Sequence, residues 1–277
     1  MPEPNSRPEP EIGVIGLGRM ARAILLPLIE SGDLAADKLV ATVARASSVE
    51  DLNSSWPAGL QVYVAGSAGS ELVWQAPMQL LGIKPQQVDA LAETAPEVDH
   101  QPLLISVLAG VTLDRLQRLF PGHRCVRAVP NTPALVGAGL TALAWGHGVT
   151  PDQQVQVKAL FASVGDVLEL PEDKLDAFLA LTSSGPAFIA LVAEAMADGA
   201  VAAGLARDLA HHLAHRTLAG TAELLHQRAL HPAVLKDMVS SPAGTTIAGL
   251  RALERGAVRS ALIEAVVSAA ERSRELA

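Results

Sequence analysis

The feature that most constrains the fold is a glycine-rich turn near the start of the chain. A short apolar run, Ile12–Ile15, leads directly into Gly16-Leu17-Gly18-Arg19-Met20-Ala21 and then into a helical pattern. The order strand, G-x-G-x-x-A, helix is typical of a turn whose backbone approaches a dinucleotide pyrophosphate, with the alanine permitting close helix packing. We therefore predict that the cofactor is bound by Gly16, Leu17, Gly18, Arg19 and Met20. The alternative is a plain strand–helix turn.

Apolar strands alternate with helical patterns as far as about residue 170. The predicted strands are 12–15, 39–43, 60–65, 80–83, 103–107 and 126–129. One helix is predicted from the glycine turn to residue 29, and a second begins at Pro85. A third covers 113–120 after the N-cap Thr112, and a fourth runs from the capping box at Thr150 to Gly165. This alternation predicts an α/β fold, a Rossmann-type, doubly wound, mostly parallel sheet.

The pattern changes after about residue 170. Long helices rich in Ala and Leu, without strand-like alternation, dominate from there to the C-terminus. We therefore predict a disordered tail at 1–10, a dinucleotide-binding Rossmann domain at 11–170 and an all-helical domain at 171–277.

Composition excludes several classes of protein. A net charge of −8 without any basic run argues against nucleic-acid binding. Cys125 is the only cysteine, which excludes an internal disulfide and fits a reducing cytoplasm, and the N-terminal tail lacks the apolar core of a signal peptide. The longest apolar stretch, 185–206, contains Glu194 and Asp198, so we expect an interface helix and no membrane span.

The end of the second predicted strand bears on the choice of nicotinamide. NAD sites usually place an acidic residue there to hold the ribose 2′-hydroxyl, but this chain has Arg45 and Ser47, with no acid before Glu50. An arginine beside a hydroxyl suits a 2′-phosphate, so we expect NADPH, with NADH as the second choice. The alternative is that Ser47 and Glu50 form a helix capping box and Arg45 is solvated.

A second informative segment lies near the C-terminus. The small-residue turn Ser241-Pro242-Ala243-Gly244 runs into Thr245 and Thr246 and then into an amphipathic helix. A helix N-terminus offers free N–H groups to an anion, and the two hydroxyls beside it offer one further hydrogen bond at a reacting centre. This combination favours a reductase acting on a small anionic substrate. The alternative is that Thr245 or Thr246 merely caps the helix.

Blocks spread over the whole chain give it a family resemblance. They are 15–24, 82–86, 105–111, 126–133, 183–187 and 231–236, the last running into the turn at 241–246. From residue 11 onward the chain resembles the pyrroline-5-carboxylate reductases, which reduce the cyclic imine 1-pyrroline-5-carboxylate to L-proline in the last step of proline biosynthesis. The resemblance implies a Rossmann domain, a helical domain interleaved in a homodimer, assembly of dimers into larger rings, and an active site between the nicotinamide and the neighbouring subunit's helical domain.

The resemblance also implies roles for individual residues. The Thr246 hydroxyl is expected to bond the substrate nitrogen, and backbone N–H groups of Ala243, Gly244, Thr245 and Thr246 to bind the substrate carboxylate, with Ser184 a further substrate contact or a helix cap. Lys84, Pro85 and Asn131 fall at carboxyl ends of predicted strands, where ligands bind in open α/β sheets, so we expect them to line the nicotinamide half of the cofactor. A surface lysine and an ordinary loop are the alternatives there.

The chain departs from the family pattern on the adenosine side of the cofactor. Arg19, Ala44 and Pro77 stand where Asn, Asn and Asp are usual, which puts cofactor preference in doubt more than substrate chemistry. His211 and His215 have metal-compatible spacing on one helix face but no recognised third ligand, so we expect no metal. Two alternatives are a related imine reductase or hydroxy-acid dehydrogenase of the same architecture, and a non-catalytic nucleotide-binding paralogue. The chain has no lysine between Lys174 and Lys236 to serve hydroxy-acid chemistry.

Overall fold

The computed structural model describes residues 9–98 and 100–275, so most of the predicted tail at 1–10 lies outside the described residues. The chain divides into two compact units. The sheet unit runs as far as Ser183 and includes the chain from Ala270 onward, and the helical unit comprises Ser184–Ala269. Each unit is described by itself below.

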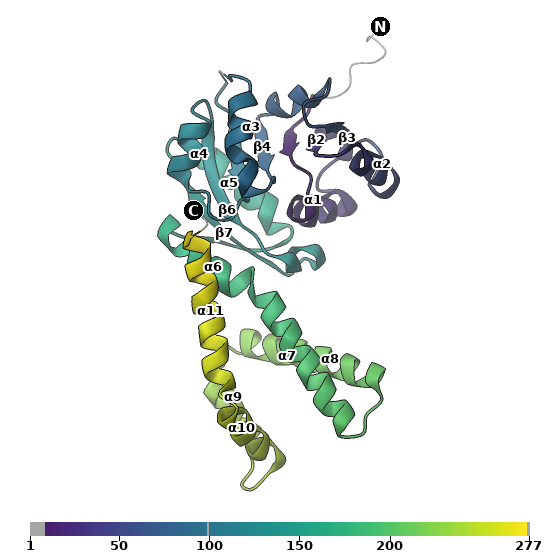
Figure 1. Cartoon of the computed structure of the whole chain (residues 1–277), viewed down its shortest axis with the longest axis vertical. Coiled ribbons are helices and arrows are strands. Elements are labelled where there is room, and N and C mark those ends of the chain that lie inside the picture. Colours follow the sequence, from purple (N-terminus) through teal and green to yellow (C-terminus); the bar gives the residue numbers. More distant parts are fainter. Residues whose placement is uncertain (1–8, 99, 276–277) are drawn as a thin grey trace. The chain divides into compact units, whose positions relative to one another are not determined.

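The sheet unit is built on one eight-stranded sheet with the order β3-β2-β1-β4-β5-β6-β7-β8 (Figure 1). Strands β1 to β6 are parallel, β7 is antiparallel to β6, and β8 is parallel to β7. The predicted mostly parallel, doubly wound sheet is therefore confirmed. The strands are β1 (Ile12–Ile15), β2 (Leu39–Val43), β3 (Gln61–Val64), β4 (Met78–Leu81), β5 (Leu103–Ser106), β6 (Arg124–Val129), β7 (Gly139–Trp145) and β8 (Gly165–Glu169).

Helices cover both faces of this sheet, which explains why its central strands are apolar without alternation. Alternate strand residues face one core built with α1 (Arg19–Ser31), α2 (Ala46–Ser55) and α5 (Pro151–Ala162). The intervening residues face a second core built with α3 (Val88–Thr94) and α4 (Leu113–Leu119). A third, smaller core joins β6 and β7 to α6 (Leu175–Thr182). The 3-10 turns are η1 (Ala36–Lys38), η2 (Ser70–Trp74), η3 (Pro85–Gln87), η4 (Thr132–Val136) and η5 (Glu172–Lys174).

The predicted N-caps at Thr112 and Thr150 are confirmed. Thr112 accepts a hydrogen bond from the Arg115 N–H at the start of α4, and Thr150 and Gln153 form the reciprocal pair that opens α5. The end of one helix was predicted wrongly. The helix that begins at Pro151 ends at Ala162, not at Gly165, and Gly165 instead begins β8. Strands β7 and β8 were not predicted.

The helical unit consists of α7 (Gly185–Ala202), α8 (Arg207–Gln227), α9 (Pro232–Met238), α10 (Thr245–Arg255) and most of α11 (Val258–Glu275). Small residues, Ala197, Ala210 and Ala214, form the contact between α7 and α8. Many large apolar side chains are exposed in the single chain, among them Ile189, Leu191, Met196, Leu213, Ile263 and Val267. Among the described residues, one stretch, 172–202, is long and apolar enough to cross a membrane on length and composition alone. Apolar area exposed on this scale marks an interaction surface.

Candidate active site

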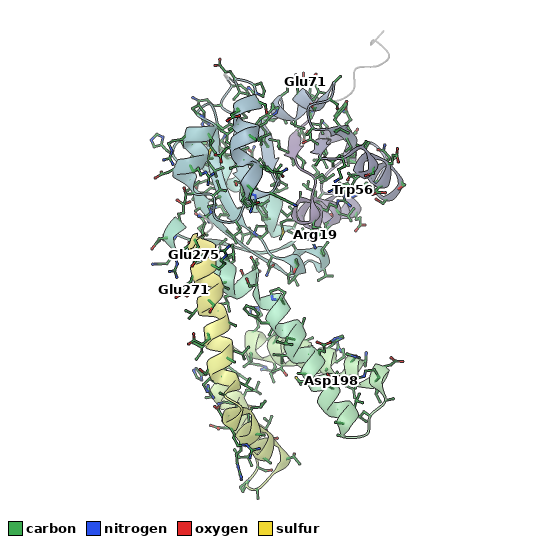
Figure 2. The ribbon with its side chains drawn as sticks, viewed as in Figure 1. Arg19, Trp56, Glu71, Asp198, Glu271 and Glu275 are labelled. Carbon is green, nitrogen blue, oxygen red and sulfur yellow. The ribbon has the colours of Figure 1, made fainter. Side chains whose placement is uncertain are left out.

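The glycine turn between β1 and α1 has the geometry that its sequence predicts. Gly16 has a φ of +91°, and a Cβ there would lie 2.7 Å from Cγ2 of Ile83. The first N–H groups of any helix have no intrahelical partner, and Gly18, the N-cap of α1, has no side chain that could accept from them. Arg19 begins the helix, and its side chain is labelled in Figure 2. The N–H groups of Gly16, Leu17 and Gly18 are hydrogen-bonded within the protein, so it is the first turn of α1 that can present free N–H groups, together with the Arg19 cation, to an anion.

Thr42 on β2 holds this turn in place, and the sequence analysis missed it. Its Oγ1 accepts a hydrogen bond from the Gly16 N–H at 3.3 Å, and its carbonyl accepts one from the Leu17 N–H at 2.8 Å. Thr42 is buried and pairs with Ile15 in the sheet register. A threonine at the end of an otherwise apolar strand was the available signal, because a hydroxyl at a buried position needs a partner.

Arg45 and Ser47 lie just beyond the carboxyl end of β2, and both are exposed. Arg45 is the N-cap of α2, whose N-terminus carries no side-chain cap and no acidic residue. The alternative capping box at Ser47 and Glu50 is therefore wrong, because Ser47 lies inside the helix. The Arg45 guanidinium makes no ion pair within the described residues, which leaves it available to a phosphate.

Lys84 and Asn131 follow the carboxyl ends of β4 and β6, as predicted, but only the Lys84 side chain is exposed to a ligand. Lys84 is exposed. Asn131 is buried, its Oδ1 accepts a hydrogen bond from the Leu140 N–H at 2.8 Å, and its Nδ2 donates to the Thr182 carbonyl at 3.0 Å. Both polar atoms of the Asn131 side chain are thus engaged within the protein, so the side chain serves the fold and the backbone is the part assigned to the cofactor.

These segments meet along one edge of the sheet. Because β1, β2, β4 and β6 are parallel, the glycine turn, Arg45, Lys84 and Asn131 all follow strand ends at the same edge. The strand order reverses between β1 and β4, which is the switch point where open α/β sheets bind dinucleotides.

In the helical unit, the turn at 241–246 opens α10. Gly244 is the N-cap and makes no side-chain cap, so the alternative that Thr245 or Thr246 caps the helix is wrong. Ala243 has a φ of +57°, the left-handed region that non-glycine residues seldom adopt. The first intrahelical bond runs from the Ala248 N–H to the Gly244 carbonyl, which leaves the N–H groups of Thr245 and Thr246 without intrahelical partners.

One predicted donor is already in use. The Gly244 N–H donates to the Ser241 carbonyl at 3.0 Å, which closes the turn, so its expected free N–H is corrected here. A Cβ on Gly244 would lie 2.3 Å from Oγ and 3.1 Å from the carbonyl oxygen of Ser241, so a larger residue here would require Ser241 to shift. Ser184 is the N-cap of α7 but makes no side-chain cap, and His231 caps α9 by accepting a hydrogen bond from the Ala233 N–H, which is a structural role.

The largest pKa shifts in the described residues belong to buried groups of the sheet unit. Burial lowers the pKa of His123 to about 4 and raises the pKa of Cys125 to about 12. His123 precedes β6, at the edge opposite the glycine turn. The described neighbours of Thr246 in sequence, from Ser240 to Leu250, include no carboxylate. Hydroxyl and N–H groups therefore dominate this turn.

A glycine turn at a sheet switch point, with free cations beside it and a second, all-helical unit, defines a nicotinamide-dependent oxidoreductase with a dimerisation domain. Residues 11–110 match the family model "NADP oxidoreductase coenzyme F420-dependent", and residues 172–276 match "Pyrroline-5-carboxylate reductase dimerisation". The chain belongs to the pyrroline-5-carboxylate reductase family, because relatives far above 30% identity match nearly its whole length.

Individual relatives make the same point. A pyrroline-5-carboxylate reductase of Synechocystis sp. is 45% identical over 96% of this chain and 98% of its own length. The pyrroline-5-carboxylate reductase of Arabidopsis thaliana is 40% identical over 96% of this chain and 95% of its own length. The crystal structure of Plasmodium falciparum pyrroline carboxylate reductase with NADP bound has a TM-score of 0.85 and 25% identity, covering 96% of this chain and 97% of that one.

Family membership settles several expectations. The chain is an oxidoreductase with an NADP-binding domain, and its helical region forms a homodimer. The apolar stretch 172–202 lies within the dimerisation region, so it belongs to a soluble enzyme and is not a membrane span.

Proposed function

We propose that the chain performs the reaction after which its family is named, the reduction of the C=N bond of 1-pyrroline-5-carboxylate to give L-proline, with NADPH as the reductant. Near-full-length relatives at 37–45% identity that carry this name support the reaction. The observation that carries it in this chain is the turn at 241–246, where free N–H groups and the Thr246 hydroxyl occur together at a helix N-terminus.

The sheet unit would hold the dinucleotide along its carboxyl edge. The turn Gly16-Leu17-Gly18 would bring the backbone close to the pyrophosphate, and the N–H groups of Arg19 and Met20 would bind it at the N-terminus of α1, where the helix dipole favours negative charge. Arg45 and Ser47 would bind the 2′-phosphate, and Lys84, Pro85 and the Asn131 backbone would line the nicotinamide half. When bound, NADPH supplies the hydride.

The turn at 241–246 would hold the substrate. The N–H groups of Ala243, Thr245 and Thr246 would bind its carboxylate, with Gly244 fixing the turn and Ser184 as a further contact. The Thr246 hydroxyl would bond the ring nitrogen. This residue is half-buried, so its hydrogen bond forms in a partly dehydrated place where it is stronger.

The chemistry fits the absence of an acidic group beside Thr246 in the sequence. If the imine is bound protonated, hydride arriving at the C=N carbon cancels the positive charge on nitrogen and leaves a neutral amine, so the step needs no strong general acid. Thr246 then orients the nitrogen through a hydrogen bond. Most of the rate enhancement comes from holding the imine carbon in register with the hydride donor.

The oligomeric state beyond the dimer and the cellular compartment are also proposed. Homodimers are proposed to assemble into a larger ring, as the family resemblance implies, and the apolar side chains that the single chain exposes on α7, α8 and α11 are available for such contacts. The cytoplasm is the proposed compartment, supported by a single, buried, unpaired cysteine.

The test is the oxidation of NADPH, and separately of NADH, by the purified dimer with 1-pyrroline-5-carboxylate, followed by the absorbance of the reduced nicotinamide. Turnover with formation of proline, faster with NADPH, is the expected result. A folded dimer that binds NADPH but turns over no imine would refute the proposed activity, and a preference for NADH would refute only the role given to Arg45.

A further inference from the structure

The glycine turn after β1 uses the N–H groups of its three residues inside the protein. The Gly18 N–H donates to the Gly16 carbonyl at 2.8 Å, which closes the turn. The N–H groups of Gly16 and Leu17 both donate to Thr42 on the neighbouring strand β2, at 3.3 Å to its Oγ1 and at 2.8 Å to its carbonyl. Thr42 therefore accepts two of the three hydrogen bonds that these N–H groups donate.

The Thr42 hydroxyl is used both as a donor and as an acceptor. While Oγ1 accepts from the Gly16 N–H, it donates to the Val14 carbonyl at 3.4 Å. Thr42 is only 6% exposed, so water has little access to either bond. A buried hydroxyl that makes both bonds is confined to one orientation. It thereby connects β1 to the first residue of the turn that follows it.

The opposite side of the turn is packed closely against the segment that follows β4. A Cβ on Gly82 would lie 2.8 Å from the Gly16 carbonyl oxygen, and a Cβ on Gly16 would lie 2.7 Å from Cγ2 of Ile83. Glycine permits many backbone conformations, so packing alone does not select the one in which Gly16 has a φ of +91°. The hydrogen bonds to Thr42 make that selection.

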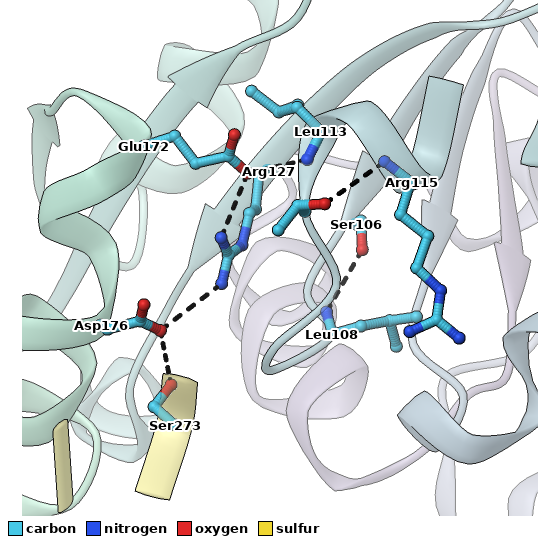
Figure 3. Close-up of polar contacts among 9 residues, drawn as sticks. Ser106, Leu108, Leu113, Arg115, Arg127, Glu172, Asp176 and Ser273 are labelled. Carbon is cyan, nitrogen blue, oxygen red and sulfur yellow. Dashed lines mark hydrogen bonds and ion pairs between the residues drawn. The ribbon is translucent and has the colours of Figure 1, made fainter. Parts of the chain in front are cut away.

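A second buried hydroxyl at a strand end shows what is particular to Thr42. Ser106 ends β5, and its Oγ accepts from the Leu108 N–H at 3.3 Å (Figure 3). That bond joins residues two positions apart and stays within one loop. The bond between Gly16 and Thr42 joins residues 26 positions apart, so it connects the conformation of the turn with the pairing of β1 and β2.

The conformation of the turn decides where the free N–H groups of α1 point. The first intrahelical bond runs from the Arg22 N–H to the Gly18 carbonyl at 3.0 Å. The three N–H groups before it, those of Arg19, Met20 and Ala21, therefore have no intrahelical partner. Donors that are fixed before an anion arrives lose less conformational freedom when it binds, and they bind it more tightly.

We propose that the Thr42 hydroxyl is a positioning group for the dinucleotide: by holding the Gly16 amide it fixes the N-terminus of α1 before the cofactor arrives, and so raises the affinity for the pyrophosphate. This role rests on the proposed function, in which the pyrophosphate binds at that N-terminus. Thr42 is assigned no contact with the cofactor and acts through Gly16. Because NADPH and NADH share the pyrophosphate, the effect is equal for the two, unlike that of Arg45.

The experiment removes the hydroxyl without changing the shape of the side chain. Thr42→Val keeps a β-branched residue in the strand and deletes the acceptor, whereas Thr42→Ser keeps the hydroxyl. The matched control is Thr141→Val, the same substitution at a buried position on β7. For each purified dimer we would measure the Kd of NADPH and of NADH by the fluorescence of the reduced nicotinamide. The unfolding temperature and the amide hydrogen exchange of residues 15–18 would be measured without nucleotide.

The expected result is that Thr42→Val raises the Kd of NADPH and of NADH by the same factor, about fivefold or more, as the loss of one net hydrogen bond implies. Exchange of the Gly16 amide should be faster in this variant. Thr42→Ser and Thr141→Val should bind both nucleotides within about twofold of the wild type. Unchanged affinity in a folded Thr42→Val dimer, equal weakening in Thr42→Ser, or a weakening confined to NADPH would overturn the proposal.

The wild-type protein provides the test if Thr42→Val does not fold. Its Gly16 amide should be protected from exchange without nucleotide to the same degree as β1, and exchange as fast as in an exposed loop would overturn the role of Thr42. A folded wild type that binds neither nucleotide would refute the proposed function, and the exchange measurement alone would then decide whether Thr42 holds the turn.

Discussion

Oε1 of Gln79 lies 3.0 Å from Nε2 of His123, and this contact fixes the tautomer of a buried imidazole. The amide nitrogen of Gln79 donates to the carbonyls of Trp74 and Ala76, at 2.9 Å and 3.2 Å. Its oxygen must therefore accept, and the proton of the neutral imidazole sits on Nε2. The ring lies edge-on to both Trp74 and Phe120, with centroids 5.9 Å and 5.7 Å away, so its burial among aromatic side chains makes a positive charge on it costly.

The first prediction is a loss of stability in mild acid that depends on His123. Burial lowers its pKa from 6.5 to about 4, so between these values the unfolded chain takes up a proton that the folded chain refuses. Stability then falls as pH falls from 6.5 to 4, by about 3 kcal/mol in total, and is unaffected by this group above pH 6.5. Urea unfolding at pH 7 and at pH 4.5 measures the difference.

His123→Gln keeps a donor for Gln79 and cannot titrate, so its stability should change much less between the two pH values. The exposed His147 provides the control, because His147→Gln should leave the pH dependence as in the wild type. A His123→Gln protein with the full wild-type pH dependence would show that other groups are responsible.

The second prediction concerns Thr246. Thr246→Ala should lower kcat/KM for the imine by about 10²-fold, because the hydrogen bond that orients the ring nitrogen is lost and the imine carbon is no longer held in register, and should leave the Kd of NADPH unchanged. Thr246→Ser keeps the hydroxyl and should retain most of the activity. Thr245→Ala, which changes a side chain assigned no role, is the neighbour control. Equal activity of Thr246→Ala and Thr246→Ser would remove the hydroxyl from the mechanism.

The third prediction separates NADPH from NADH. A guanidinium bound to a phosphate forms strong, charge-assisted hydrogen bonds, so Arg45→Ala should raise the KM for NADPH about tenfold or more and change that for NADH by less than about twofold. Arg118→Ala, on the exposed face of α4, controls for the loss of a surface cation. An equal effect on the two cofactors would assign Arg45 to a part of the dinucleotide that both share.

The fourth prediction is that the only thiol is inert in the native protein. Cys125 is fully buried and its pKa is raised to about 12 by burial, so almost no thiolate exists at neutral pH. A disulfide reagent at pH 8 should label the native dimer far more slowly than the urea-unfolded chain. Labelling at the same rate in both would mean that β6 opens readily in solution.

Local patterns accounted for most of the fold. The glycine turn, the cap at Thr112 and the capping box at Thr150 were readable because each is decided by residues a few positions apart. Strands β7 and β8 were missed for the opposite reason. Gly139–Trp145 has no clean alternation, and it becomes a strand because β6, an apolar neighbour already in the sheet, pairs with it in the antiparallel sense.

The same limit applies to the candidate site. The segments expected at the sheet edge follow strand ends there, since parallel strands bring their carboxyl ends together. The partners of single side chains were not predictable. Thr42 meets Gly16 only through the register of β1 and β2, and Asn131 is occupied by Thr182, 51 positions further along the chain. The substrate and cofactor roles of the individual residues stay predictions.

The antiparallel direction of β7 also decides whether the chain leaves the sheet at its amino edge or at its carboxyl edge. After β6 reaches the carboxyl edge, β7 and β8 both run away from that edge, and α6 is the return pass that brings Thr182 and Ser183 back beside Pro130 and Asn131. If β7 and β8 were parallel to β6, the chain would need one more crossing of the sheet, between β6 and β7, to return to the amino edge. The helix α6 would then end at the amino edge and not at the carboxyl edge. A single antiparallel pairing therefore lets the chain leave at the dinucleotide end of the sheet without an additional connecting segment.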